Sequence, residues 1–195
     1  MTGAIAQTEA WYPRVVVPYS IRLFGDPVLK QRAKDVTEID GDFVRIVETM
    51  FETMYEARGV GLAAPQVGIQ KRFFTYDVDD EPGVLINPEV VDGSGEWVYD
   101  EGCLSVPGLH FEIVRPNLVT VRGLDLNGNE VIVEADELMG RMLQHEIDHL
   151  DGVLLLDRLE PEVRREALRE LRQRDAATVG VGGAGSVGGD GHRGL

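Results

Sequence analysis

Two histidines and a glutamate have the types and the spacing of a metal-dependent hydrolase. His145, Glu146 and His149 form a His-Glu-x-x-His pattern in a segment that is predicted to be a helix. Imidazoles four residues apart lie on one face of a helix and can bind one divalent metal, while the glutamate between them approaches a water on that metal. The pattern also occurs on half-buried helices without a metal. Leu138 and Met142 continue the same stripe, which indicates that the metal-binding face is enclosed by protein.

Two histidines need a third protein ligand, and the single cysteine is one candidate. Cys103 follows a predicted strand, and Gly102 before it would allow close approach to the helix. A thiolate would complete a Cys-His-His site with one position open for water. A single cysteine is more often an inert buried thiol, and a conventional zinc peptidase could use Glu160 or Glu162 instead. Spacing alone leaves these alternatives open.

The helix with the histidines is predicted over residues 136–150 and ends at Asp151-Gly152. An amphipathic helix is predicted over 42–58, capped by Asp40 or Asp42 and ended by Gly59. A proline-opened helix over 161–174 carries balanced glutamates and arginines. The predicted strands cover residues 72–78, 84–86, 89–91, 96–99, 111–114, 118–124 and 130–134, with a short further strand at 153–156.

Turn signals between these strands favour antiparallel hairpins. The predicted fold class is α+β, with a central metal-binding helix surrounded by antiparallel β-sheets, a helix in the N-terminal half and a C-terminal helix. At 195 residues the chain fits one domain. We predict an arm over residues 1–18, a catalytic domain over 19–175 and a disordered glycine-rich tail over 176–195.

The formal net charge of −15 disfavours a broad surface for DNA or RNA, because phosphate binding needs clustered positive charge. The chain shows no basic leader followed by an apolar run, and no apolar stretch long enough to span a bilayer. We therefore expect a cytoplasmic protein without a DNA or membrane partner. One cysteine excludes an internal disulfide.

Three segments together resemble the motifs of peptide deformylases. They are Gly59-Val60-Gly61-Leu62-Ala63-Ala64-Pro65-Gln66, Glu101-Gly102-Cys103-Leu104-Ser105 and Gln144-His145-Glu146-Ile147-Asp148-His149-Leu150. Their order and approximate spacing match that family, as does Gly25-Asp26-Pro27-Val28-Leu29, so the resemblance covers roughly residues 20–160. The family's α+β fold, with β-sheets around a metal-bearing helix, agrees with the predicted order of elements.

The resemblance implies removal of the formyl group from the N-terminal formyl-methionine of new polypeptides. It also implies one divalent metal ion held by Cys103, His145 and His149. Members of the family typically use Fe(II), although zinc, nickel or cobalt can occupy the site. Thiolate and imidazole suit several of these metals, so the ligand types do not select one.

The same resemblance assigns the chemistry to a few residues. Glu146 takes the proton of the attacking water and later returns it to the leaving amine. The side-chain amide of Gln66 and the backbone N–H of Leu104 stabilise the tetrahedral oxyanion. Gly61 lets the substrate lie close to the backbone of its loop.

Methionine specificity requires an apolar pocket beside the metal. The candidates for its wall are Val60, Tyr99, Leu138 and Met142, although ordinary core packing uses the same residue types. His110 stands near a place where some relatives have arginine. Arg115 and Asp148 are a candidate ion pair that would fix the metal helix.

The sequence leaves two rival functions open. One is the zinc peptidase, and the other is a degenerate deformylase-like binding module that has lost turnover. Such a module is expected to lack Glu146 or Gln66, and both are present. The C-terminal helix resembles the form of the family found in many bacteria, and its arginines suggest ribosome binding as a weaker hypothesis.

Overall fold

The computed structural model describes residues 17–180, with side chains as far as residue 174. The long helices are α1 (Gly41–Glu56), α2 (Glu137–Leu150) and α3 (Pro161–Gly180), and short 3-10 helices cover Pro27–Lys30, Ala64–Val67 and Leu155–Arg158. The strands are β1 (Gly61–Ala63), β2 (Phe73–Val78), β3 (Glu81–Ser94), β4 (Trp97–Cys103), β5 (Val106–Arg115), β6 (Leu118–Leu124) and β7 (Glu130–Ala135). None of the helices in this part of the chain combines the length and apolar character needed to cross a membrane.

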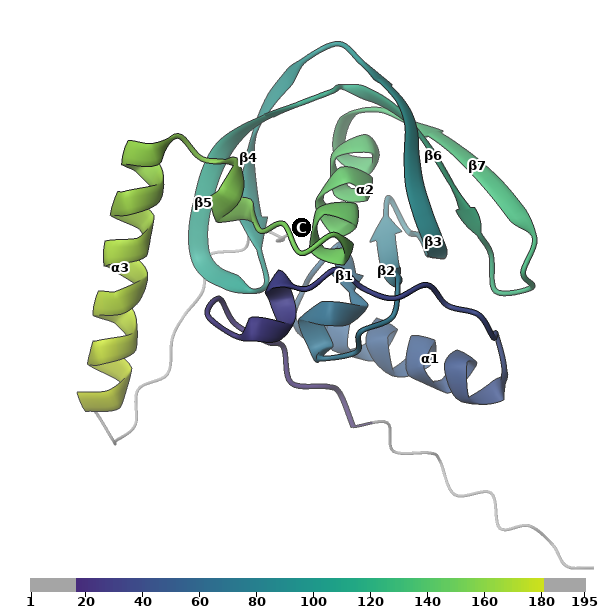
Figure 1. The fold of residues 1–195 in the computed structure, drawn as a ribbon, viewed down its shortest axis with the longest axis horizontal. Coiled ribbons are helices and arrows are strands. Elements are labelled where there is room, and N and C mark those ends of the chain that lie inside the picture. The colour runs from purple at the N-terminus through teal and green to yellow at the C-terminus, as the bar shows by residue number, and fades with distance from the viewer. Residues whose placement is uncertain (1–16, 181–195) are drawn as a thin grey trace, which may run out of the picture.

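Two antiparallel sheets lie around α2, as Figure 1 shows. One sheet has five strands in the order β1-β2-β3-β6-β7, and the other pairs β4 with β5. The main core is the apolar face of α2, including Met142, Leu143 and Leu150, packed with Phe74 and Val121 of the larger sheet. The α+β class and the central position of the histidine-bearing helix are therefore confirmed.

Helix α1 packs on the larger sheet through a second apolar cluster. The side chain of Asp40 caps its start by accepting a 2.8 Å hydrogen bond from the N–H of Phe43, as predicted. The ring of Phe43 lies edge-on against that of Phe73, with centroids 4.7 Å apart. The helix stops at Glu56, before the predicted end at Gly59, and Arg58 takes the left-handed conformation with φ of 58°.

Two strand predictions need correction. The predicted strands 84–86 and 89–91 belong to one strand, β3, which extends beyond both of them to Glu81 and Ser94. Register shifts near residues 86–92 break its alternation, so a continuous strand looked like two short ones. The predicted strand 153–156 is wrong, because its leucines are buried by a 3-10 turn over Leu155–Arg158.

Helix α3 stands beside β5 at the edge of the molecule (Figure 1). Ala167 on its inner face joins Leu155, Leu156 and Val106 in a third apolar cluster, which also contains Cys103. The helix continues to Gly180, so the predicted boundary after residue 175 falls inside it. Most of the predicted arm and tail, residues 1–16 and 181–195, lies outside the described residues.

Gly140 should be essential for the close packing of α2 against the backbone of residues 117 and 135. An added Cβ would lie 2.8 Å from the carbonyl oxygen of Ala135 and 3.2 Å from that of Asn117. We expect Gly140→Ala to lower the free energy of unfolding by about 1–3 kcal/mol, because backbone cannot move aside as a side-chain end can. Urea unfolding measures the change.

Gly41 of α1 is the matched control, since its Cβ would meet only the Arg45 side chain at 3.6 Å. Gly41→Ala should be neutral or stabilise by about 0.4–1 kcal/mol. Equal effects of the two substitutions would contradict the close seat of α2.

Candidate active site

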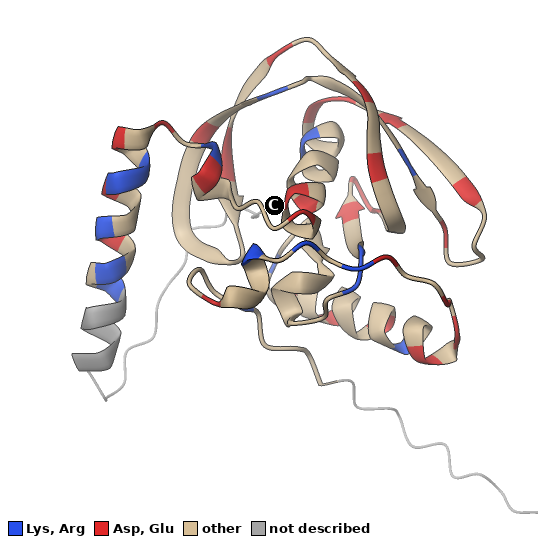
Figure 2. Cartoon of the chain, viewed as in Figure 1, with Lys and Arg blue, Asp and Glu red and all other residues tan. Residues whose placement is uncertain are grey.

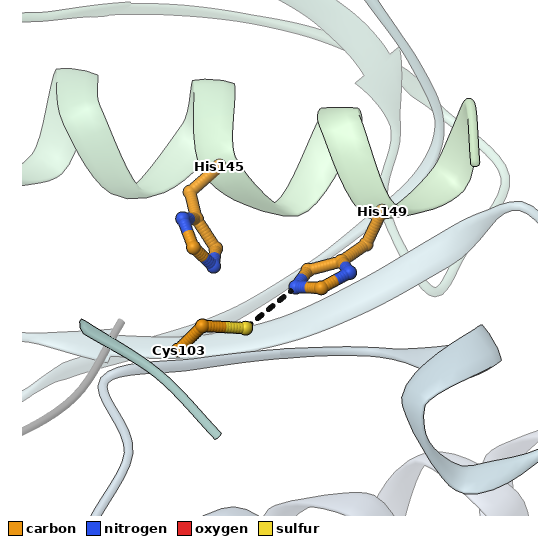
Figure 3. Close-up of side chains that lie close together, drawn as sticks. All are labelled: Cys103, His145 and His149. Carbon is orange, nitrogen blue, oxygen red and sulfur yellow. Dashed lines mark hydrogen bonds between the residues drawn. The ribbon is translucent and has the colours of Figure 1, made fainter. Parts of the chain in front are cut away.

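Helix α2 and the end of β4 bring three metal-binding side chains together. His145 and His149 project from successive turns of α2 with ring centroids 5.0 Å apart, and Cys103 faces them from β4 (Figure 3). One ligand atom from each residue lies within 4.8 Å of the others. The Sγ of Cys103 is 3.2 Å from Nε2 of His149. All three residues are buried, so the structure brings together the predicted ligands.

Cys103 reaches this position at an irregular end of the β4–β5 hairpin. Gly102 pairs with His110, whereas the next residue, Cys103, pairs with Val106. A Cβ on Gly102 would lie 2.6 Å from Cε1 of the His110 ring. Gly102 therefore makes room for His110, rather than for the approach of α2 that we predicted.

The charges in this cluster fit a cation. Burial acts to lower the pKa of both histidines, and it holds that of His149 well below the usual range. The nearby sulfur of Cys103, the hydrogen bond to Glu101 and the negative charge of Glu146 nevertheless raise the pKa of His145 to about 10. Nε2 of His145 and Nδ1 of His149 have no hydrogen-bond partner among the described groups. A divalent ion would supply the positive charge that this site otherwise takes up as a proton.

Glu101 orients His145, and our sequence interpretation gave it no role. Its carboxylate accepts bonds from Arg115 at 2.6 and 3.0 Å and from Arg141 at 2.5 Å, and its Oε2 lies 3.1 Å from Nδ1 of His145. Burial would raise the pKa of Glu101, but bonds from His145 and Arg115 hold it well below its usual range. Since an ionised carboxylate only accepts, Nδ1 carries the hydrogen and Nε2 is left for a metal.

The predicted ion pair between Arg115 and Asp148 is present. Nη1 of Arg115 donates to Oδ2 of Asp148 at 2.8 Å, and Arg158 also binds this carboxylate. Both members of the pair are buried. Arg115 therefore links Glu101 on β4 to the metal helix through two carboxylates.

Arg141 is a second residue that sequence interpretation missed. It is 1% exposed, donates to the carbonyl of Ile113 at 3.0 Å and also binds that of Trp97. Its guanidinium lies 4.9 Å from the ring centroid of Trp97 and 5.6 Å from that of Tyr99. A charged residue on the apolar stripe of a predicted helix was the available signal, because such a residue needs a buried partner.

Glu146 lies on the same helix in a different environment. It is completely buried, and neither carboxylate oxygen has a hydrogen-bond partner in the described part of the chain. Burial raises its pKa to about 7, although the positive charge of His145 acts to lower it. A carboxyl group in this state can take up and release a proton near neutral pH.

Gly61 is required beside Glu146. A Cβ at Gly61 would lie 2.6 Å from Oε1 of that side chain. The lack of a side chain at Gly61 therefore leaves room for the carboxyl group of Glu146. Its predicted contact with substrate remains a prediction.

The amide of Gln66 also faces the metal ligands. Its Oε1 accepts a 2.8 Å bond from the N–H of Ala63, which fixes the orientation of the amide. Its Nε2 donates to Oγ of Ser105 at 3.3 Å and lies 4.0 Å from Sγ of Cys103. Leu104 forms the turn after Cys103, so both predicted oxyanion donors belong to segments at the ligand cluster.

A cavity of about 180 Å³ lies beside Cys103. Its walls are Ala57, Gly102, Cys103, Leu104, Pro107, Gly108, Leu109 and His110. Of the four predicted pocket residues, Val60 and Met142 are buried in the main core and Leu138 packs against it. Tyr99 is 40% exposed and packs on Trp97 and Arg141.

Comparison with known proteins decides the family. The sequence model described as polypeptide deformylase matches residues 18–165. The chain belongs to the peptide deformylase family. The zinc peptidase and the degenerate binding module are not favoured, and the chain is a hydrolase that deformylates nascent polypeptides. The family is metal-dependent, and Cys103, His145 and His149 form the group that could hold the ion.

Named peptide deformylases are similar over most of their length. That of Natranaerobius thermophilus is 53% identical over 75% of this chain and 95% of its own, and that of Thermodesulfovibrio yellowstonii is 48% identical over 77% and 93%. The solved deformylase of Legionella pneumophila superposes with a TM-score of 0.79 at 40% identity, covering 84% of this chain and 98% of that one. The deformylase of Ehrlichia chaffeensis, solved in complex with actinonin, gives a TM-score of 0.77 at 39% identity over 81% and 98%.

Glu101 offers a test of the support around the ligands. Glu101→Gln places an amide NH₂ against Arg115, Arg141 or His145 in a buried site. We expect metal affinity to fall by about 10- to 100-fold. The free energy of unfolding should fall by about 3–5 kcal/mol, because buried arginines lose their counter-charge. Competition with a chelator and urea unfolding measure the two changes.

Glu112→Gln on the exposed side of β5 is the matched control and should change neither quantity. Wild-type metal affinity in Glu101→Gln would show that His145 is oriented by other groups.

Proposed function

We propose that this chain deformylates N-formyl-methionyl polypeptides with Cys103, His145 and His149 as metal ligands and Glu146 as the proton carrier. The observation that supports this assignment is a buried Cys-His-His cluster next to a buried carboxyl group that has no hydrogen-bond partner among the described residues. A carboxyl group with a pKa raised to about 7 suits transfer of a proton in both directions at neutral pH.

Fe(II) is the proposed native metal, with zinc, nickel or cobalt as substitutes. One thiolate and two imidazoles suit each of these ions. A bound divalent cation acidifies water and polarises a carbonyl oxygen. Two observations support the ligand set. Glu101 orients His145, whose Nε2 has no hydrogen-bond partner in the part of the chain that the structure describes. Nε2 of His149 contacts Sγ of Cys103.

Glu146 acts twice in the proposed reaction. Its carboxylate accepts the proton of the attacking water, and the resulting carboxylic acid gives that proton to the amine that leaves. Gly61 keeps the carboxyl group close to the loop that follows α1. Because the group is buried and makes no competing hydrogen bond in the described chain, either oxygen can accept the proton.

Gln66 and the N–H of Leu104 are the proposed donors to the oxyanion. Donors that are fixed before the reaction stabilise developing charge without reorganisation. The bond from Ala63 to Oε1 of Gln66 supports this role, since it directs the donor end of the amide toward Cys103.

The proposed methionine pocket is formed by Val60, Tyr99, Leu138 and Met142, with Gly61 at the substrate backbone. The support for Leu138 and Met142 is that they precede His145 along the helical stripe that carries both histidines. The stacking of Tyr99 on Arg141 supports a fixed position for this ring.

Purification without oxygen, followed by metal analysis and an assay on formyl-Met-Ala-Ser, tests the proposal as a whole. We expect one metal per chain, with iron predominant, and release of formate in proportion to metal content. A metal-loaded protein that releases no formate would contradict the proposed function.

Replacing Glu146 with glutamine separates metal binding from proton transfer. The amide keeps the size of the side chain but cannot carry the proton. We expect turnover to fall by about 10⁴-fold, near the upper end for acid–base catalysis, while metal content stays unchanged. Turnover and metal stoichiometry are measured on the same preparation.

Glu137→Gln on the exposed first turn of α2 is the control and should be fully active.

Wild-type kcat/KM should decline on acidification, because protonated Glu146 cannot accept a proton. A cation at the neighbouring ligands favours the ionised form, so the decline is expected to begin at or below pH 7. Retained activity in Glu146→Gln would remove this residue from the reaction.

We expect the proposed reaction to take place in the cytoplasm, because its substrates are nascent polypeptides. Ribosome binding through α3 is a weaker proposal, supported by the arginines of its described part (Figure 2). Five arginines and three glutamates lie in residues 161–174, in a chain with a net charge of −15. Unchanged sedimentation with ribosomes after removal of residues 161–195 would reject it.

A further inference from the structure

Arg174 of α3 ties this helix to the hairpin that carries Cys103. Nη1 of Arg174 donates to the carbonyl of Pro107 at 3.0 Å, and its Nη2 donates to that of Gly108 at 3.3 Å. Nη2 also binds Oε1 of Glu170, one turn earlier on the helix, at 2.6 Å. One side chain thus joins two consecutive carbonyl groups to α3.

The hairpin needs support at this point. Cys103 pairs with Val106 and Gly102 pairs with His110, which leaves residues 107–109 without a partner on β4. A strand segment outside the ladder lacks the inter-strand hydrogen bonds that would otherwise hold it. The bonds from Arg174 hold two of these three residues.

The backbone conformation of Gly108 suits this contact. Its φ of +71° lies in the left-handed region that favours glycine, and an added Cβ would lie 2.9 Å from Nη1 of Arg174. Backbone conformation and side-chain approach therefore both depend on the same glycine.

The segment that Arg174 holds is a wall of the cavity beside the metal ligands. Pro107, Gly108, Leu109 and His110 line this cavity together with Cys103 and Leu104. We propose that Arg174 is a positioning residue that fixes this wall for the part of the peptide that follows the formyl-methionine. The inference rests on the proposed function, because it gives the cavity beside Cys103 to the substrate peptide.

A positioning role predicts a specific kinetic change. A wall that moves should weaken binding of the peptide beyond methionine and leave the metal, Glu146 and Gln66 undisturbed. KM for formyl-Met-Ala-Ser should rise in Arg174→Ala by about threefold to tenfold, the range expected for the loss of ordinary hydrogen bonds. kcat, metal content and the kinetics of formyl-methionine alone should stay near wild type.

Three further variants complete the test. Arg172→Ala, on the same helix and without the contact to the hairpin, should match the wild type. Arg174→Lys keeps the charge and one donor group but not the fork that reaches two carbonyls, so its KM should be intermediate. A Gly108→Ala variant should raise KM as Arg174→Ala does.

Binding of formyl-Met-Ala-Ser to Glu146→Gln protein, with and without Arg174→Ala, separates this inference from the proposed function. Calorimetry should show the same threefold to tenfold weakening in the absence of turnover. Equal affinities, an equal rise in KM for formyl-methionine, or a loss of metal would each overturn the positioning role. Binding that depends on Arg174 in a metal-loaded wild type that releases no formate would instead contradict only the proposed function.

Discussion

The buried carboxylate of Glu101 is the interaction on which the site depends. It is reached by Arg115 from β5 and by Arg141 and His145 from α2, so one side chain of β4 joins three elements. Uncompensated ions inside a protein are strongly destabilising, and each partner here is required by the others. The geometry of the ligand cluster follows, because His145 is held by the same contacts that join α2 to the smaller sheet.

Glu101 and Glu146 show how position separates the chemistry of two carboxyl groups. Both are completely buried, yet hydrogen bonds and positive charge keep Glu101 ionised, whereas Glu146 has no hydrogen-bond partner in the described chain and burial raises its pKa to about 7. The first group can therefore fix a ligand, and the second can move a proton. Residue type alone does not distinguish them.

The C-terminal helix is connected to the site in two ways. Its apolar face shares a cluster with Cys103, and Arg174 holds the turn that follows this ligand. Residues 104–110, which follow Cys103 and include this turn, lie where the pairing of β4 with β5 is irregular. This arrangement makes α3 a support for one wall of the site, in addition to any role of its outer surface.

Local pattern determined the elements and the chemistry they carry. Spacing placed His145, Glu146 and His149 on a helix, and strand β6 has the predicted limits of residues 118–124. The order of three motifs added Cys103 and indicated the family. These signals are readable because helix and strand periodicity depends on near neighbours in the chain.

Tertiary structure decided which residues support the ligands. Glu101 and Arg141 are 40 positions apart, and their contact exists only because the smaller sheet packs on α2. Residues 153–156 were predicted to be a strand, but Leu155 and Leu156 begin a 3-10 turn and are buried in a cluster with Ala167 of α3 and Val106 of β5. Long-range packing and electrostatics leave no periodic trace in a single sequence, so the partners of Glu101, the environment of Glu146 and the contact of Arg174 became visible only in the folded chain.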